Sequence, residues 1–172
     1  MFLGIDESNH GKFPEIFVGM YSPNISLLKR GCYEKQRRIA NRKFLDIPYK
    51  HLIFSQTNAD VIGKVNIPVI AIARLAKYVD SVMPLNTIYV DGELKSDQLA
   101  TIERLVYAFN KKAKLKPETH LDTSMRLVNE ADNRANFLHR YYAKYSDKGG
   151  RKIDYVHKLI TPRLEDYYDY LL

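Results

Sequence analysis

The sequence contains a single cysteine, Cys32, and no tryptophan. One cysteine excludes a disulfide within the chain and a zinc site built from several cysteines, so we interpret Cys32 as structural. No apolar run approaches the roughly 20 residues needed to span a bilayer. The acids Asp6 and Glu7 come too early for a secretory signal segment. From these absences we expect a cytoplasmic protein with no membrane partner.

The chain is, by contrast, rich in apolar residues and in positive charge. Its 172 residues are 45% hydrophobic, which is enough for one domain with a full core, and we expect a single domain over residues 1–172. The formal net charge is +7 and the pI about 9.3. A basic surface suits a polyanionic partner such as nucleic acid, although many proteins with other partners are also basic. We take a monomer as the default oligomeric state.

Hydrophobic periodicity predicts a chain that begins with strands and then alternates strands with helices. Asn66 followed by Pro68 is a typical helix start. The expected strands cover residues 2–6, 15–22, 24–31, 51–56, 86–92 and 124–130, and the expected helices cover 65–83, 96–114 and 131–145. Residues 33–45 permit a helix with one strongly basic side, and residues 147–172 are expected to form a helical C-terminal extension. This order predicts an α/β fold with a mixed sheet of about five strands flanked by helices.

Acidic residues follow several of the predicted strands. Asp6 and Glu7 end the first strand, Asp91 ends a later one, and Glu130 and Asp132 lie where a predicted strand meets a helix. If these strands are neighbours, the acids converge at one edge of the sheet and repel one another unless cations neutralise them. Oxygen ligands favour hard ions such as Mg²⁺ or Mn²⁺. Two such ions about 3.5–4 Å apart can clamp a phosphodiester during in-line displacement.

Three short segments, GIDES, IYVDG and NEADN, resemble the motifs of the ribonuclease-H-like superfamily, and in particular those of type 2 ribonucleases H. The segment NIPVIAIARLAKYV also resembles the helix that precedes the middle motif in that family. The resemblance implies a ribonuclease-H-like sheet and hydrolysis of the RNA strand of RNA–DNA hybrids with two Mg²⁺ or Mn²⁺ ions. It assigns the catalytic and metal-binding roles to Asp6, Glu7, Asp91 and Asp132, with Glu130 either replacing a ligand or supporting one.

The sequence departs from the type 2 pattern directly after Asp6 and Glu7. The family follows its first two acids with a small residue and Gly-Arg-Gly, whereas this chain has Ser8, Asn9, His10 and Gly11. Glycine permits close approach of the backbone to a ribose 2′-hydroxyl, so we expect a relaxed or shifted sugar preference. The long separation of Asp91 from Asp132 looks more like other branches of the superfamily.

Basic and polar residues outside the acidic motifs are candidate contacts to nucleic acid. One basic run lies within residues 33–45, and a second includes Lys111, Lys112, Lys114 and Lys116. Either group can also be an ordinary solvated surface, so we favour a binding role only together with the acidic site. The residues for which we predict nucleic-acid contacts are Asn9, His10, Arg37, Arg38, Arg42, Lys43 and Arg140.

Other interpretations of the same residues remain open at this point. Asp6 and Glu7 can be ordinary strand-end acids, and Asp132 can be an acid favoured by the dipole at a helix N-terminus. A DNA or structure-specific nuclease of the same superfamily also fits the motifs. A non-catalytic nucleic-acid-binding module would be expected to have lost one of the acids, and none is visibly lost. A carboxylate-pair glycosidase is disfavoured by the basic pI and the absence of tryptophan.

Overall fold

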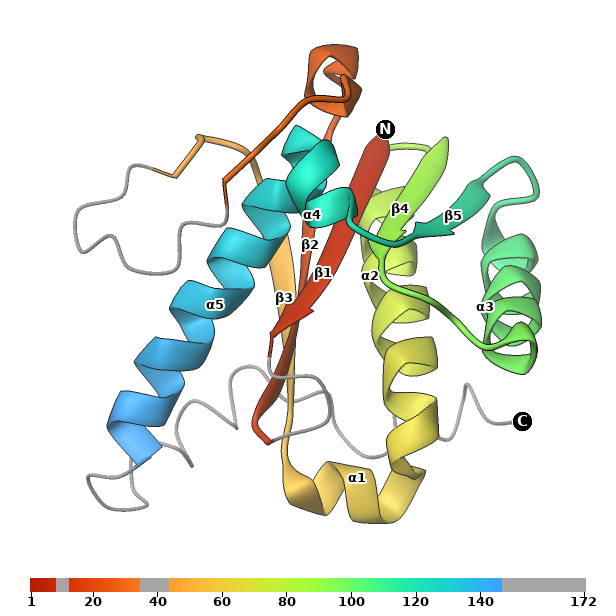
Figure 1. Ribbon diagram of the computed structural model, residues 1–172. Coiled ribbons are helices and arrows are strands. Elements are labelled where there is room, and N and C mark those ends of the chain that lie inside the picture. The colour runs from red at the N-terminus through yellow and green to blue at the C-terminus, as the bar shows by residue number, and fades with distance from the viewer. Residues whose placement is uncertain (9–12, 35–43, 147–172) are drawn as a thin grey trace.

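A computed structural model of the chain describes residues 1–8, 13–34 and 44–146, with side chains described as far as residue 140. Five strands form one mixed sheet in the order β3-β2-β1-β4-β5 (Figure 1). β1, β2 and β3 pair antiparallel, whereas β4 and β5 run parallel to β1. The strands are Phe2–Ser8 (β1), Glu15–Ser22 (β2), Tyr49–Phe54 (β3), Thr87–Asp91 (β4) and Lys114–Glu118 (β5). This sheet confirms the predicted fold class.

Helices cover both faces of the sheet. α2 and α3 pack together on one side, and α5 crosses β1 and β2 on the other side, with α4 at its start (Figure 1). No helix among the described residues is both long enough and apolar enough to cross a membrane. The α-helices are Gln56–Ile62 (α1), Ile67–Val82 (α2), Ser96–Phe109 (α3), Leu121–Ser124 (α4) and Arg126–Ser146 (α5), and two 3₁₀ turns are Ile25–Leu28 (η1) and Lys64–Asn66 (η2).

β1 is the central strand, and its alternating side chains serve two different layers. Leu3 and Ile5 are buried in the core that β1 shares with α2, whereas Gly4 lies against α5. Because side chains alternate along a strand, Asp6 points to the same face as Gly4, toward α5. The residue pattern of β1 therefore places an acid in the layer between the sheet and α5.

Gly4 allows α5 to lie unusually close to β1. A Cβ atom at this position would lie 2.9 Å from Cγ of Leu127 and 3.2 Å from both the Leu127 carbonyl carbon and Cγ2 of Val128. Two of these atoms belong to branched side chains packed in the core, and one belongs to the backbone of α5. Neither the side chains nor the helix can therefore move away easily. Glycine at this position holds α5, with its acidic residues, against the end of β1.

Two of the predicted strands are wrong. Residues 24–31 form η1 and a single bridge between Arg30 and Met125, rather than a strand. Residues 124–130 lie in α4 and α5, so Glu130 and Asp132 are within a helix and not at a strand-to-helix junction. The buried hydrophobic residues from this segment into the rest of α5 follow helical spacing, with successive members three or four positions apart along one face. They are Leu127, Val128, Ala131 and Ala135.

The remaining predictions agree with the structure within a few residues at each end, except at two elements that were missed. β5 was not predicted: the expected helix over 96–114 overlaps only its first residue, and its alternation of lysines with Leu115 is interrupted by Pro117. α1 was not recognised, although Ser55 and Asn58 form a capping box at its start. The basic segment 33–45 lies largely outside the described residues, and the predicted extension over 147–172 lies entirely outside them.

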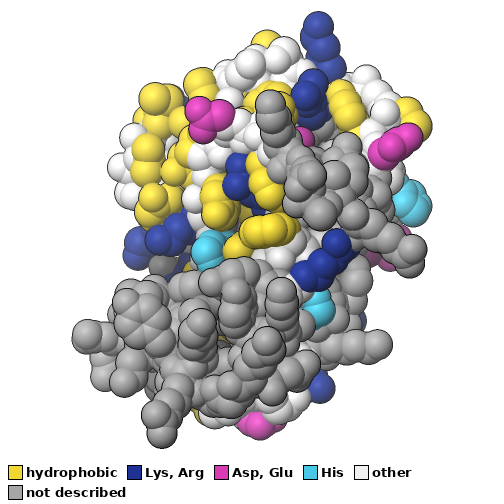
Figure 2. Space-filling model, turned by 90° about the vertical axis from the view of Figure 1, so that its left-hand side faces the viewer, with side chains coloured by type: hydrophobic (Ala, Val, Ile, Leu, Met, Phe, Trp, Pro, Cys, Tyr) yellow, Lys and Arg dark blue, Asp and Glu magenta, His cyan; other side chains and the backbone are white. Residues whose placement is uncertain are grey.

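On the side of the molecule seen in Figure 2, hydrophobic side chains and Lys or Arg side chains lie next to one another. Arg134 of α5 is one link between α5 and the segment before β3. Its guanidinium carbon lies 4.7 Å from the ring centre of Phe44 and 4.3 Å from that of Tyr49, and it donates a hydrogen bond to the carbonyl of Leu45. Planar guanidinium groups stack well on aromatic faces, so Arg134 anchors α5 from its outer side.

Candidate metal centre

Asp6 is a carboxylate buried in the layer between β1 and α5. Only 4% of its surface is exposed. Its Oδ1 accepts a hydrogen bond from the backbone N–H of Glu7 at 2.6 Å, whereas Oδ2 is buried and has no hydrogen bond with any described residue. A buried carboxylate oxygen without a donor is costly, and a bound water or cation is one means of satisfying it.

Asp91 comes to the same edge because β4 runs parallel to β1. Ile5 pairs with Val90, so the next residue of each strand, Asp6 and Asp91, lies at the same edge of the sheet. Gly92 follows with φ of +101°, a conformation that glycine adopts readily, and the chain leaves the sheet there. The two strand ends therefore place these acids side by side, as the sequence predicted.

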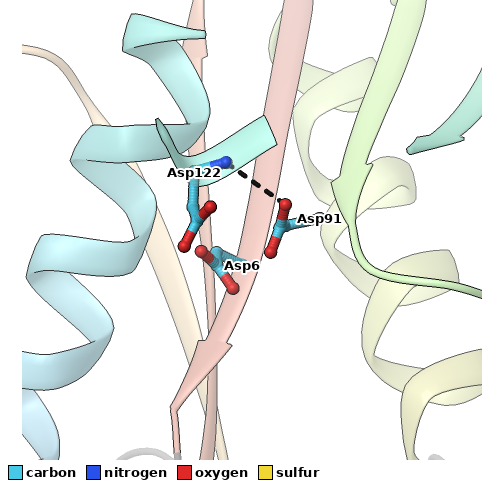
Figure 3. Close-up of side chains that lie close together, drawn as sticks. All are labelled: Asp6, Asp91 and Asp122. Carbon is cyan, nitrogen blue, oxygen red and sulfur yellow. Dashed lines mark hydrogen bonds between the residues drawn. The ribbon is translucent and has the colours of Figure 1, made fainter. Parts of the chain in front are cut away.

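Asp122 completes the group, and sequence reasoning missed it. It lies in α4, is only 2% exposed, and its backbone N–H donates to Oδ1 of Asp91 at 3.2 Å. Asp6, Asp91 and Asp122 each offer a carboxylate oxygen, and these oxygens lie within 4.8 Å of one another. Figure 3 shows the three side chains pointing toward one another from β1, β4 and α4.

A signal for Asp122 was present in the sequence. Asp122 follows β5 by a few residues, just as Asp91 ends β4, and β4 and β5 are parallel neighbours. Recognition of β5 as a strand would have extended the pattern of acids that follow parallel strands. His120 lies between the end of β5 and the start of α4. Its backbone is left-handed, with φ of 62°, and turns the chain into α4.

Asp132 adds a fourth negative charge near the group, from α5. The pKa of Asp6 is raised well above its usual range, first by burial, then by the charge of Asp132, and then by those of Asp91 and Asp122. Asp132 is 6% exposed, and its Oδ1 accepts a hydrogen bond from Nδ2 of Asn136 at 2.6 Å. Each of these charges raises the free energy of the ionised site, and cations bound between them would lower it.

Glu7 and Glu130 are placed differently from the three clustered aspartates. Because side chains alternate along β1, Glu7 points to the face opposite Asp6. It lines a cavity of about 210 Å³ that Asp6 and Asp91 also border, with Phe17 among its apolar walls. Glu130 is buried on α5 and is not part of the group of carboxylates whose oxygens converge. Their roles as ligands remain predictions.

The donor set fits a hard divalent cation. Three buried or half-buried carboxylates supply only oxygen atoms, and one buried oxygen of Asp6 has no donor. Mg²⁺ and Mn²⁺ bind such ligands, whereas zinc sites in proteins rely largely on nitrogen and sulfur. The three residues could therefore hold an ion.

The predicted nucleic-acid contacts lie mostly outside the described residues. Arg140 is exposed on α5, about two turns beyond Asp132. The others, Asn9, His10, Arg37, Arg38, Arg42 and Lys43, fall in segments that the structure does not describe.

Comparison with known proteins identifies the fold but not a family. No protein-family model matches the sequence, and no curated protein sequence matches it. A chain in the solved structure of the PCNA:RNase HII complex from Archaeoglobus fulgidus is similar in fold, with a TM-score of 0.50 and 15% sequence identity. The similarity covers 95% of this chain and 90% of that chain. At this identity the likeness concerns the fold alone, which is a ribonuclease-H-like α/β sheet.

Proposed function

We propose that the protein is a divalent-metal-dependent nuclease that hydrolyses phosphodiester bonds in nucleic acid, and that its substrate is the RNA strand of RNA–DNA hybrids. The observation that carries the proposal is the convergence of Asp6, Asp91 and Asp122, whose oxygens lie within 4.8 Å of one another at the carboxyl ends of adjacent parallel strands. The ribonuclease-H-like fold and the net charge of +7 support it.

Within this proposal, Asp6 is the central ligand. Its carboxylate lies beside those of Asp91 and Asp122, and the charge of Asp132 also acts on it. Asp91 and Asp122 complete one ion site, and Asp132 contributes to the other. A divalent ion held by these residues would supply Lewis-acid chemistry: it would favour ionisation of a water and offset negative charge at the phosphodiester. The hydrogen bond from Asp122 N–H fixes the orientation of the Asp91 carboxylate for this task.

The sugar preference belongs to the same proposal. The metal ligands would contact phosphate and water, so they do not discriminate ribose from deoxyribose. Discrimination requires backbone groups close to the 2′-hydroxyl, and the sequence after Ser8 retains only Gly11 of the glycines in the type 2 pattern. We therefore propose cleavage without strict specificity for an isolated ribonucleotide.

A cleavage assay tests the proposal. Labelled RNA–DNA hybrid, DNA duplex, duplex with one ribonucleotide and single strands are incubated with Mg²⁺, Mn²⁺ or EDTA. We expect metal-dependent cleavage that is fastest on the hybrid, lost in Asp6→Asn and Asp122→Asn, and retained in Asp97→Asn, an exposed acid of α3. Cleavage that persists in both buried variants, or that is indifferent to EDTA, would contradict the metal mechanism. Exclusive cleavage at the single ribonucleotide would contradict the proposed substrate.

A further inference from the structure

The edge strand β5 carries lysines on the face of the sheet that holds the acidic cluster. Asp91 pairs with Glu118, and Tyr89 pairs with Lys116. Paired residues on neighbouring strands point to the same face, so Glu118, Lys116 and Lys114 share the face of Asp91. Residues two apart on a strand are separated by about 6.6 Å. On this face, Lys116 therefore lies about 6.6 Å along β5 from Glu118, the partner of Asp91, and Lys114 lies the same distance further on.

The charges of these lysines are not neutralised by other described residues. Within the described parts of the chain, Lys114 and Lys116 form no ion pair, whereas Glu118 is paired with Arg30. Nζ of Lys116 lies 5.8 Å from the centre of the Tyr89 ring, and both lysines are exposed. The nearest acid on β5 is thus already paired, and the two lysines are available to bind an anion.

A groove between α3 and β5 lies on the other side of this edge strand, because α3 packs with α2 on the sheet face opposite α5. It has a volume of about 490 Å³ and is lined by Val106, Leu115 and Tyr107, with Lys114 and Lys116 among its other lining residues and Glu103 as its acid. Figure 1 shows α3 and β5 next to each other at this edge of the molecule. Tyr107 is 58% exposed. Nζ of Lys111 lies 5.6 Å from the centre of the Tyr107 ring. The groove thus offers an aromatic ring and apolar walls, and β5 lies between it and the face that Lys114 and Lys116 share with Asp91.

We propose that β5 and the end of α3 bind a single-stranded segment of nucleic acid that crosses the open edge of β5, with phosphates on Lys114 and Lys116 and an unpaired base stacked on Tyr107. Lysines supply the charge that phosphates require, and aromatic rings stack on bases of any sequence. A base enters the groove only when it is unpaired, which selects a single strand over a duplex. The inference rests on the proposed function, because a single-stranded end of the hybrid substrate would continue from the acidic cluster onto β5.

The edge of β5 is less suited to the other partner that an open edge strand can take, an extended peptide. Pro117 lacks a backbone N–H and therefore removes a donor from the strand, and exposed lysines on an edge strand disfavour pairing with another strand. The lysines and the groove are then better explained by a polyanion that contacts side chains than by a peptide that pairs with the backbone.

The first test measures binding without cleavage. Full-length Asp6→Asn protein in EDTA is titrated into a fluorescent single-stranded oligonucleotide at several salt concentrations, and anisotropy is recorded. We expect Lys114→Ala with Lys116→Ala to reduce the slope of log K against log salt by about 1.4, since each phosphate contact to a single strand contributes about 0.7. The matched control is Lys50→Ala with Lys64→Ala, two exposed lysines near the rings of Tyr78 and Phe13. An equal change in both double variants would overturn the proposal.

The second test concerns the aromatic ring. Tyr107→Leu should weaken binding of the single strand by roughly five- to 150-fold, the range found for loss of one stacked base, whereas Tyr107→Phe should bind as well as the parent. Binding of the matching duplex should not respond to either change. Equal binding by the Leu and Phe variants, or an equal loss for single strand and duplex, would contradict the proposed stacking.

The two proposals can fail separately. If the native protein cleaves no substrate but single-strand binding depends on Lys114, Lys116 and Tyr107, the binding surface stands and the nuclease proposal falls. If cleavage depends on Asp6 but binding is unaffected by the β5 and α3 variants, the nuclease proposal stands and this inference falls.

Discussion

Replacement of Asp6 by asparagine should stabilise the protein in metal-free buffer, although it removes the central residue of the proposed site. Asn keeps the oxygen that accepts the hydrogen bond from Glu7 N–H, and it removes a negative charge that is buried beside other carboxylates. Its side-chain N–H₂ can also donate to a neighbouring carboxylate oxygen. The substitution therefore removes repulsion without leaving a cavity.

The size of the effect follows from the spacing of the carboxylates. Two unit charges 4.8 Å apart repel by about 3.5 kcal/mol at an effective dielectric constant of about 20. Each carboxylate spreads its charge over two oxygens, and protonation of Asp6 relieves part of the repulsion, so we expect a gain of about 2–3 kcal/mol in the free energy of unfolding. For a chain of this length, that gain raises Tm by about 4–12 °C.

The gain should depend on pH in a defined direction. The pKa of the Asp6 carboxyl is higher in the folded protein than in the unfolded chain, so the folded state binds this proton more tightly. The free-energy cost of ionising Asp6 in the folded protein is therefore absent below the unfolded pKa, about 3.9. It grows as the pH rises from there through the folded pKa. The difference between Asp6→Asn and the native protein should vanish near pH 4 and be largest at neutral pH and above.

Thermal and urea unfolding in EDTA, repeated with Mg²⁺ or Mn²⁺, measure these differences. Added ions should stabilise the native protein more than Asp6→Asn and so reduce the gap. The control, Asp97→Asn, removes an exposed acid from the first turn of α3 and should be neutral or slightly destabilising. If Asp6→Asn is less stable than the native protein in EDTA at neutral pH, or if the control is stabilised equally, the electrostatic reasoning is refuted.

Two further predictions concern the packing around the sheet. Gly4→Ala should destabilise the protein by about 1–3 kcal/mol in urea unfolding, because its Cβ would lie 2.9 Å from Cγ of Leu127, and an unchanged midpoint would show that α5 can move away freely. His51, stacked on Tyr49, has its pKa lowered to about 4 by burial and by the charge of Lys50, so stability should fall by roughly 2 kcal/mol as pH drops from 6.5 to 4.5. In His51→Phe this contribution should disappear, and an identical pH profile in variant and native protein would argue against it.

The sequence predicted the first half of the candidate site because two physical signals coincide there. Asp6 and Asp91 each end a short apolar strand, and parallel neighbouring strands bring their ends to one edge of the sheet. That reasoning needs only the local pattern and the pairing of β1 with β4. It succeeded because both strands are buried and therefore strongly apolar.

Asp122 and Asp132 were harder to place because their surroundings depend on tertiary packing. β5 is an edge strand with exposed lysines and a proline, so its sequence resembles a loop or helix end. The segment around Leu127 is apolar enough for a strand, and only the continuation of its spacing to Ala135 reveals a helix. The charge of Asp132 thus acts on Asp6 from a helix packed against Gly4, an arrangement that no local pattern specifies.

The most direct test of the central claim, that the buried aspartates form a metal centre, is anomalous diffraction from crystals grown or soaked in Mn²⁺. The account predicts a manganese peak bounded by carboxylate oxygens of Asp6, Asp91 and Asp122. It also predicts that Asp122→Asn crystals treated in the same way show a weaker peak or none. Manganese bound only elsewhere, or no peak at these residues at saturating Mn²⁺, would contradict the metal centre and the nuclease proposal that depends on it.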